Sequence, residues 1–151
     1  MVIGRGAFGK VYLGEDKETK KLYAIKTMKK SELIKSGMVE LAEQEAEILK
    51  DINYPFLIDL VFMFHSKYRI FFVQPFIEGG ELTSLLQKHK RFQEDTILFF
   101  GAQLVLAIGH LHEHHIVHRD MKLDNVLVDK DGYIKVIDYG IARRLGADED
   151  A

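Results

Sequence analysis

The start of the chain alternates between apolar and polar residues with a period of two. Two such runs, 11–13 and 22–24, are separated by the charged stretch 16–20. Alternation of this kind is typical of half-buried strands, and a polar connection between two of them predicts a β-hairpin. The β-rich runs 56–62 and 70–73, separated by a short polar turn, predict a second hairpin.

The period changes to that of an α-helix further along the chain. Between residues 38 and 50, apolar residues recur at helical spacing on one face, which predicts an amphipathic helix. The same reasoning predicts further helices at 81–88 and 93–112 and short strands at 117, 126–128 and 133–137. A strand-rich half therefore meets a helix-rich half near residue 77, and small ligands often bind at such junctions.

The composition narrows the possible partners. Apolar residues make up 47% and charged residues 29% of the 151-residue chain, as in ordinary globular domains. A net charge of −2 offers no attraction to nucleic acid or to an anionic membrane, so neither is expected as a partner. The absence of cysteine excludes disulfides and thiolate metal sites and suits a reducing compartment, so we expect a cytoplasmic location. The longest apolar segment, 97–111, is interpreted as a buried core helix that is too short to span a bilayer.

Gly4, Gly6 and Gly9 form a Gly-x-Gly-x-x-Gly pattern that fits three kinds of ligand-binding loop. A Rossmann unit requires a helix after the last glycine, whereas residues 11–13 are strand-like. A Walker A loop requires a Ser or Thr as magnesium ligand where this chain has Val11. The third interpretation is a hairpin whose glycines let backbone N–H groups approach phosphates. A tight turn without any ligand is also compatible with the pattern.

Two charged residues occupy positions where the pattern predicts core-facing side chains. Lys26 shares a strand face with Leu22 and Ala24, and Glu45 lies within the apolar stripe of the helix predicted at 38–50. Isolated charges in such places are costly unless they meet an ionic partner. Each side chain could reach solvent separately. We favour an ion pair in which Glu45 directs Lys26 toward a phosphate.

Two short polar motifs carry the candidate chemistry, namely residues 118–125 (His-Arg-Asp-Met-Lys-Leu-Asp-Asn) and 138–140 (Asp-Tyr-Gly). Carboxylate and amide oxygens suit Mg²⁺, and a carboxylate beside a lysine suits the handling of a hydroxyl proton next to phosphate. Taken alone, Asp-x-x-x-x-Asn on a loop is also ordinary turn chemistry. Together with Lys26, Glu45 and the glycine pattern, these motifs resemble the active site of eukaryotic protein kinases, which carry His-Arg-Asp-x-x-x-x-Asn and Asp-Phe-Gly.

The resemblance covers all 151 residues and implies an α+β, bilobal protein-kinase-like fold. A strand-rich small lobe at 1–77 would lack the start of its first strand, and an incomplete helical large lobe would occupy 78–151. The implied activity is that of a transferase that uses ATP and Mg²⁺ to phosphorylate a protein Ser or Thr hydroxyl. Asp120 would take the hydroxyl proton, Lys122 would steady the phosphoryl group, and Asn125 and Asp138 would hold Mg²⁺. The nucleotide would be bound by Ile3, Gly4, Gly6, Gly9, Val11, Ala24, Lys26, Glu45, Pro75, Ile77 and Leu127.

Residues 53–57, 76–82 and 132–134 resemble the AGC group of kinases. In basophilic members of that group, acidic residues at the positions of Glu81 and Asp124 recognise an arginine upstream of the phosphoacceptor. The resemblance therefore implies a protein substrate with basic residues there. Two ordinary solvated carboxylates are the other interpretation.

The resemblance ends shortly after Asp138-Tyr139-Gly140, where a kinase of this kind continues with an activation segment and further helices. We therefore expect a truncated chain that is weakly active or inactive alone. The alternative function is a half-domain that binds nucleotide or a partner chain without catalysis.

One further motif points to a different chemistry. His110, Glu113 and His114 match the zinc pattern His-x-x-Glu-His, and a helix would put both histidines on one face. We favour a polar helix end, where imidazoles interact favourably with the negative end of the helix dipole.

Overall fold

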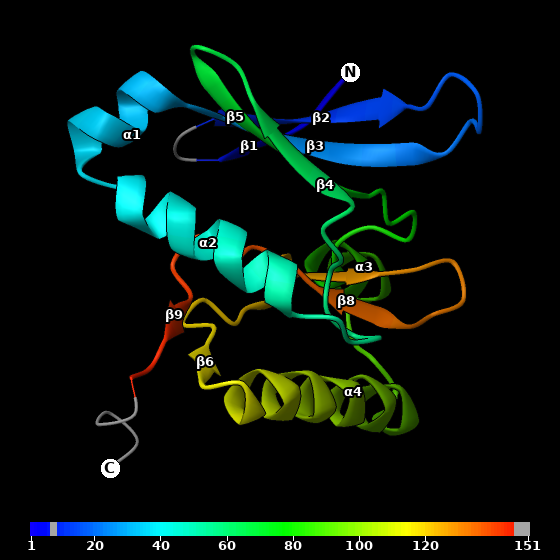
Figure 1. Cartoon of the computed structure of the whole chain (residues 1–151). Coiled ribbons are helices and arrows are strands. Elements are labelled where there is room, and N and C mark those ends of the chain that lie inside the picture. The colour runs from blue at the N-terminus through cyan, green and yellow to red at the C-terminus, as the bar shows by residue number, and fades with distance from the viewer. Residues whose placement is uncertain (7–8, 147–151) are drawn as a thin grey trace.

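The computed structural model describes residues 1–6 and 9–146. The first half of the chain forms an antiparallel five-stranded sheet, which is the upper layer in Figure 1. Its strand order is β1-β2-β3-β5-β4, with β1 at Val2–Gly6, β2 at Gly9–Glu15, β3 at Leu22–Lys29, β4 at Phe62–His65 and β5 at Arg69–Pro75. The first predicted hairpin is present as β2–β3, and the second is present as β4–β5 with its first strand later in the chain than predicted.

The last glycine of the glycine pattern is required by strand packing. The β2–β3 pair keeps a regular register along its whole length. A Cβ added to Gly9 would lie 1.6 Å from the carbonyl oxygen of Thr27 on β3. Only a residue without a side chain permits this approach of the two backbones. On its other side β2 pairs with β1, with a register shift between Val2 and Gly4.

Two helices follow β3. The first, α1 (Lys30–Ser36), ends at Gly37, and the second, α2 (Val39–Asp51), runs beneath the sheet in Figure 1. The amphipathic helix predicted at 38–50 is confirmed by α2, which buries Ala42, Glu45, Ala46, Ile48 and Leu49. The helix α1 was not predicted, because seven residues are too few to display a helical period.

The strand predicted at 56–62 is wrong in its position, because β4 begins only at Phe62. Leu57 instead makes an isolated parallel bridge to Val136, and the Ile58 N–H donates to the Val136 carbonyl at 3.0 Å. Leu57 and Ile58 are almost fully buried. The apolar run is therefore a buried connection to the second half of the chain, and an apolar pattern alone does not distinguish such a segment from a strand.

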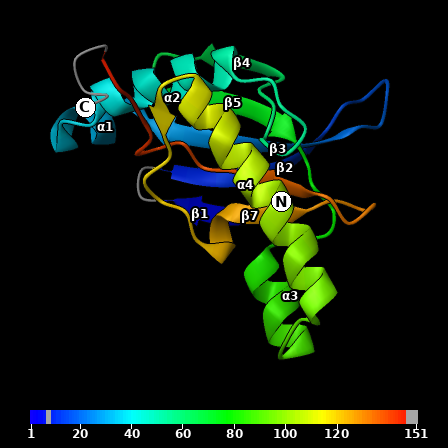
Figure 2. The same cartoon turned by 90° about the horizontal axis from the view of Figure 1, so that it is seen from below.

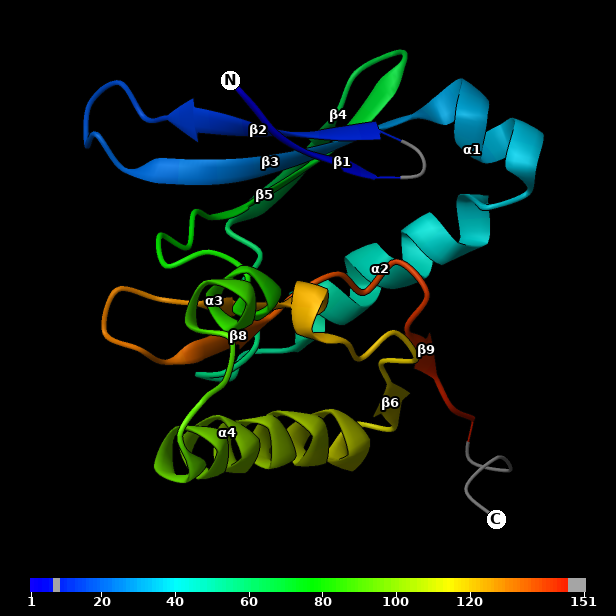
Figure 3. The ribbon, with the colours of Figure 1, turned by 180° about the vertical axis from the view of Figure 1, so that it is seen from behind.

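The second half of the chain contains two helices, a short 3₁₀ helix and two small sheets. The elements are α3 (Leu82–His89), α4 (Glu94–Glu113), β6 (Ile116–Val117), η1 (Leu123–Asn125), β7 (Val126–Val128), β8 (Ile134–Val136) and β9 (Arg143–Arg144). β7 pairs with β8, and β6 pairs with β9. Figure 3 shows α3 and β8 between the five-stranded sheet and α4. The helices and strands predicted for this half are confirmed, whereas the short β9 was not predicted.

Within the part of the chain that the structure describes, α4 is buried along one face only. Of its twenty residues, Gln103, Ala107 and Leu111 are buried, and in Figure 2 the helix lies across the underside of the molecule. Among the described residues this segment is therefore buried along one face, and much of its remaining apolar surface is exposed. By length and composition alone α4 could cross a bilayer, a criterion that core helices of soluble proteins also satisfy. The absence of a membrane segment remains a prediction.

Apolar residues from both halves share one hydrophobic core. Ile48 and Leu49 of α2 and Phe72 of β5 belong to the same buried cluster as Val126 of β7 and Ile134 of β8. The α+β fold class is thus confirmed, and the common core holds the sheet and the second half in a defined relation.

Candidate active site

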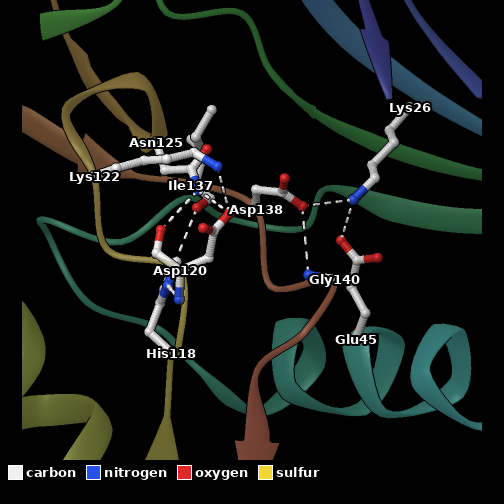
Figure 4. A network of polar contacts seen from close by, with 9 residues as sticks. All are labelled: Lys26, Glu45, His118, Asp120, Lys122, Asn125, Ile137, Asp138 and Gly140. Atoms are coloured by element: carbon white, nitrogen blue, oxygen red, sulfur yellow. Dashed lines mark hydrogen bonds and ion pairs between the residues drawn. The ribbon is translucent and has the colours of Figure 1, made fainter. Parts of the chain in front are cut away.

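Lys26 on β3 lies between two carboxylates that come from different elements. Its Nζ is 2.6 Å from Glu45 Oε1 on α2 and 2.9 Å from Asp138 Oδ1, which follows β8. Figure 4 shows the three side chains pointing toward one another. The predicted Lys26–Glu45 pair is confirmed, and the alternative in which each side chain reaches solvent separately is wrong.

The charges of Lys26 and Asp138 stabilise each other, whereas the ionised form of Glu45 is favoured by Lys26 and disfavoured by burial and by Asp138. Burial disfavours the Lys26 ammonium, but the neighbouring charges of Glu45 and Asp138 outweigh this effect and raise its pKa. Burial also works against the Asp138 carboxylate, yet the charge of Lys26 prevails and lowers the pKa of Asp138. Burial raises the pKa of Glu45, and Lys26 offsets part of this rise. Lys26 is therefore a fixed cation at neutral pH, and its position is set by three elements.

The turn after β8 approaches the ion pair closely. Asp138 has a φ of 65°, which is uncommon for a residue with a side chain. The Gly140 N–H lies 3.4 Å from Asp138 Oδ1, and a Cβ on Gly140 would lie 3.2 Å from the same oxygen. A glycine therefore lets the backbone pass beside the carboxylate. Strained backbone of this kind concentrates at functional sites.

Asp120 is the centre of a second polar cluster. Its Oδ2 accepts hydrogen bonds from Lys122 Nζ at 2.7 Å and from Asn125 Nδ2 at 2.8 Å. Hydrogen bonds from Lys122 and Asn125 lower the pKa of Asp120, and the bond to Asp120 raises the pKa of Lys122. The loop therefore presents an ionised carboxylate and an ammonium group side by side at neutral pH.

His118 holds the backbone of Asp120. Its Nδ1 accepts a hydrogen bond from the Asp120 N–H at 3.3 Å, and its Nε2 lies 3.1 Å from the Ile137 carbonyl oxygen. Because a backbone N–H can only donate, Nδ1 is unprotonated and Nε2 carries the hydrogen. Burial lowers the pKa of His118, which favours this neutral ring. This positioning role was not predicted, and the sequence signals it only through the spacing of His118 and Asp120.

Backbone pairing brings the two clusters together. The Ile137 N–H donates to the Asn125 carbonyl at 2.9 Å, and Ile137 directly precedes Asp138. The Asn125 amide nitrogen also donates to the Asp120 carbonyl at 2.8 Å. Asp138 is therefore a neighbour of Asp120 and Asn125, although the β7–β8 hairpin separates it from them along the chain.

Asn125 and Asp138 offer oxygen atoms that fit a hard divalent cation. Within residues 1–6 and 9–146, neither Asn125 Oδ1 nor Asp138 Oδ2 has a hydrogen-bond or ion-pair partner. The same residues contain no group of three or more His, Cys, Asp or Glu side chains that could hold a metal ion. A Mg²⁺ ion at this place would take its other ligands from phosphate and water, as Mg²⁺ commonly does.

The first two glycines of the pattern differ from Gly9. Among the described residues, an added Cβ would meet only the Val11 side chain at Gly4, at 3.5 Å, and nothing within 4 Å at Gly6. Protein packing therefore does not explain these two glycines, and space remains beside their backbone. The strand β2 directly after Gly9 excludes the Rossmann interpretation, which requires a helix there. Residues 7 and 8 lie outside the described residues.

The chain leaves the sheet after Pro75, the last residue of β5. The Phe76 N–H donates to the Leu22 carbonyl at 3.2 Å, whereas the Ile77 N–H has no partner in the described part of the chain. The Ile77 N–H is thus available to a ligand. The predicted apolar contacts of the base are all at least partly exposed: Ile3 on β1, Val11 on β2, Ala24 on β3 and Leu127 on β7.

The two acidic residues predicted to contact a substrate lie on adjoining elements. Glu81 precedes α3 and forms a bridge with Leu127 through its backbone, and Asp124 lies in η1, which packs against α3. Both residues are exposed. Neither carboxylate has a hydrogen-bond or ion-pair partner in the part of the chain that the structure describes.

The histidines of the zinc pattern form an aromatic stack. The His110 ring lies 4.3 Å from the Tyr54 ring on one side and 4.3 Å from the His114 ring on the other. His114 Nδ1 is 2.8 Å from the His110 carbonyl oxygen, so this ring nitrogen is engaged by the backbone. The stack terminates α4, and the favoured interpretation as a polar helix end remains a prediction.

A separate hollow of about 440 Å³ lies between α3 and α4. Apolar residues, among them Leu82, Phe92, Phe100 and Leu104, form most of its lining. It contains none of the residues predicted for the nucleotide, the metal or catalysis, so we do not assign it to the candidate active site.

Known proteins resemble this chain over nearly its whole length. The family model described as the protein kinase domain matches residues 1–151. The chain is 45% identical over 142 residues to the RAC serine/threonine-protein kinase of Drosophila melanogaster, covering 94% of this chain and 23% of that protein. It is 38% identical over 143 residues to a cAMP-dependent protein kinase catalytic subunit of Arthrobotrys oligospora, covering 95% and 28%. A RAC family serine/threonine-protein kinase homolog of Dictyostelium discoideum is 37% identical over 142 residues, covering 94% and 32%.

The chain therefore spans about a quarter to a third of the length of these relatives. The resemblance inferred from the motifs, to serine/threonine kinases of the AGC type, is confirmed, and so is the kinase-like fold class. On this match and on the arrangement of Lys26, Glu45, Asp120 and Asp138, the chain belongs to the protein kinase family.

Proposed function

We propose that this chain forms the ATP-binding and phosphoryl-transfer centre of a serine/threonine protein kinase. The observation that carries the proposal is the position of Lys26, between Glu45 and Asp138 and close to the Asp120 cluster. A cation held between two carboxylates, of which Asp138 has a lowered pKa, is suited to a polyphosphate. The strand-rich part at 1–77 would act as the small lobe and 78–151 as part of the large lobe.

In this proposal the nucleotide lies between the sheet and the β7–β8 hairpin. The open space at Gly4 and Gly6 would admit phosphates near backbone N–H groups, and Gly9 would let β2 follow β3 closely. The Ile77 N–H, which has no partner among the described residues, would donate to the adenine ring. The Pro75 carbonyl would accept from the adenine amine, since proline lacks only the N–H. The base would lie between Ile3, Val11, Ala24 and Leu127.

Phosphoryl transfer breaks the bond between the β,γ-bridging oxygen and the γ-phosphorus and forms a bond from the acceptor hydroxyl oxygen to the same phosphorus. Asp120 would orient the hydroxyl and receive its proton on the carboxylate. Its lowered pKa makes it a weak base, so its main contribution is orientation, and proton transfer follows late in the step. Lys122, 2.7 Å from Asp120 Oδ2, would neutralise charge on the moving phosphoryl group.

Asn125 Oδ1 and Asp138 Oδ2 would hold Mg²⁺, which when bound neutralises charge on the phosphate oxygens. Two features of the chain support this assignment. The Asn125 amide nitrogen is engaged by Asp120, which directs the amide oxygen away from that residue, and Lys26 engages only one Asp138 oxygen. Hard oxygen donors of this type are the ligands that Mg²⁺ prefers.

The proposed substrate is a protein segment with basic residues upstream of the phosphoacceptor. The exposed carboxylates of Glu81 and Asp124, on adjoining elements and without partners among the described residues, are suited to an arginine side chain. A peptide library tests this point. Equal phosphorylation of peptides with and without upstream arginine would contradict it.

Two measurements test the proposal. Calorimetry with a non-hydrolysable ATP analogue and Mg²⁺ should detect binding by the 151-residue chain. Transfer of labelled phosphate to a basic serine peptide should fall by about 10²- to 10⁴-fold in Asp120→Asn, because Asp120 orients the acceptor, while nucleotide binding stays close to that of the unmodified chain. Asp131→Asn, on the exposed β7–β8 turn, is the matched control and should leave both quantities unchanged.

The outcomes separate the possible functions. Absence of nucleotide binding would contradict the proposed site. Binding without transfer in the unmodified chain would instead favour a nucleotide-binding half-domain that lacks catalysis.

A further inference from the structure

The two histidines of the zinc pattern are in ring contact at the C-terminal end of α4. His110 and His114 are four residues apart, which puts their side chains on one side of the helix. Their ring centroids are 4.3 Å apart and the ring planes are inclined by 42°. Two imidazoles that bind one ion at about 2.0–2.1 Å, on neighbouring coordination positions, have their ring centres roughly 4.5–5 Å apart. The observed separation is therefore close to that of a pair bridged by a metal ion.

The backbone fixes the hydrogen on the His114 ring. Its Nδ1 lies 2.8 Å from the His110 carbonyl oxygen, which can only accept a hydrogen bond. Nδ1 therefore carries the hydrogen, and Nε2 of the neutral ring keeps its electron pair. Histidines that bind a metal commonly donate their second ring N–H to a backbone carbonyl in this way, because the bond fixes the orientation of the ring. His114 thus already makes the hydrogen bond that is typical of a metal ligand.

Tyr54 fixes the orientation of the His110 ring. The two rings are stacked, with centroids 4.3 Å apart and planes inclined by 15°. Within residues 1–6 and 9–146, neither ring nitrogen of His110 has a hydrogen-bond partner. Burial and the neighbouring His114 lower the pKa of His110, whereas Glu113 acts in the opposite direction. The His110 ring is therefore held in place and is neutral at pH 7.

We propose that His110 and His114 bind one divalent transition-metal ion, with water completing its coordination. Imidazole nitrogen suits Zn²⁺ and Cu²⁺, and Cu²⁺ generally binds such ligands more tightly than Zn²⁺. The position is also electrostatically suitable for a cation, because the C-terminal end of a helix is the negative end of its dipole. The proposal agrees with the interpretation of this segment as a polar helix end and adds a ligand to it.

The site should bind its ion weakly and reversibly. Structural zinc sites have four protein ligands, whereas the described residues contain no group of three or more His, Cys, Asp or Glu side chains that could hold a metal. We therefore expect a micromolar rather than a nanomolar dissociation constant. The site shares no residue with those that we assign to nucleotide, Mg²⁺ or catalysis, so its test is independent of the proposed kinase function.

Calorimetric titration of the 151-residue chain with Cu²⁺ or Zn²⁺ alone tests the proposal. One ion per chain is expected, and an excess of Mg²⁺ should not displace it, because Mg²⁺ prefers oxygen ligands. His114→Ala should weaken the binding at least about tenfold, because it removes one of the two ligands. His112→Ala is the matched control and should leave the affinity unchanged. His112 is an exposed histidine of the same helix, but it lies two residues from each member of the pair and so on another side.

Variants of Tyr54 test whether the stack prepares the site. Tyr54→Leu should weaken the binding of the ion about tenfold, because it removes the ring that orients His110. Tyr54→Phe keeps an aromatic ring at this place and should leave the affinity unchanged. Circular dichroism without metal checks that each variant retains its helices. Equal affinities of Tyr54→Leu and Tyr54→Phe would contradict a site prepared by the stack.

Nuclear magnetic resonance identifies the ligands directly. Addition of Zn²⁺ should shift the imidazole C–H resonances of His110 and His114 and leave those of His112 in place. Absence of binding, an affinity that His114→Ala leaves unchanged, or an equal loss in His112→Ala would overturn the proposal. Shifts of the His112 resonances as large as those of the pair would overturn it as well.

Discussion

Lys26→Met should destabilise the protein in a way that depends on pH. Glu45 is 2% exposed, and without Lys26 its carboxylate and that of Asp138 would remain together without a cation. A buried carboxylate in that position avoids its charge by taking up a proton. The cost of doing so grows by about 1.4 kcal/mol for each pH unit above the ordinary pKa of the group.

The structure sets the expected size of this cost. With an ordinary pKa of 4.5 for Glu45, protonation at pH 7 costs up to ~3 kcal/mol. This agrees with the ~3–5 kcal/mol found when one partner of a buried ion pair is removed. The sign follows from linkage. When a carboxyl group has a higher pKa in the folded than in the unfolded protein, the free energy of unfolding decreases as the pH rises above the unfolded pKa. The penalty of Lys26→Met should therefore shrink to about 1–1.5 kcal/mol at pH 5.5.

Urea unfolding followed by circular dichroism measures this effect. At pH 7 the midpoint should fall by about 1–2 M, since the slope for a small protein is roughly 1–3 kcal/mol per M. The double variant Lys26→Met with Glu45→Gln should recover most of the loss, because the uncompensated carboxylate is then absent. Lys20→Met, at an exposed lysine of the β2–β3 turn, is the control and should change stability little. A penalty that stays constant between pH 5.5 and pH 7, or a double variant as unstable as Lys26→Met, would refute the reasoning.

Three further outcomes are expected from other parts of the structure. Gly9→Ala should lower the free energy of unfolding by about 2 kcal/mol or more, because its Cβ would lie 1.6 Å from the Thr27 oxygen. Gly6→Ala, where a Cβ meets no described atom within 4 Å, should change the free energy of unfolding by less than about 1 kcal/mol in the same denaturation assay. In the folded protein the pKa of Asp138 is below its ordinary 3.8, so its contribution to the free energy of unfolding is complete above about pH 5 and is lost as the pH falls through the folded pKa. Asp138→Asn should therefore make stability depend less on pH in the acid range. An unchanged pH dependence would count against the ion pair. Arg144→Ala removes an exposed 2.6 Å ion pair with α2 and should cost less than about 1 kcal/mol by thermal melting. A larger loss would mean that the β9 contact is stronger than its exposure suggests.

The predictions from sequence were accurate where local pattern and burial agree. The alternating runs before and after the first charged turn became β2 and β3, and the apolar stripe of 38–50 became the buried face of α2. Lys26 and Glu45 were recognised as partners because each broke an apolar pattern that the rest of its element obeyed. Charges at core-facing positions are a strong signal, since few arrangements make them stable.

The predictions failed where the outcome depended on contacts between distant segments. The run 56–62 has the composition of a strand, but Leu57 and Ile58 pair with Val136 of the second half, so β4 starts only at Phe62. Composition shows how apolar a segment is, whereas its pairing and its burial depend on which other segments pack against it.

Residue identity and short spacing are enough to predict most of the local elements, the protein kinase family and the chemical types in the candidate active site. The packing of separate elements is needed to show that Lys26 contacts Asp138 as well as Glu45, and that His118 holds the Asp120 backbone as a neutral ring. Those contacts join residues from separate elements at distances of about 3 Å, and they arise only when the sheet, α2 and the β7–β8 hairpin close on a common core. A pattern along the chain can indicate that Lys26 and Glu45 need an ionic partner, but the distances and any further partners depend on how the elements pack.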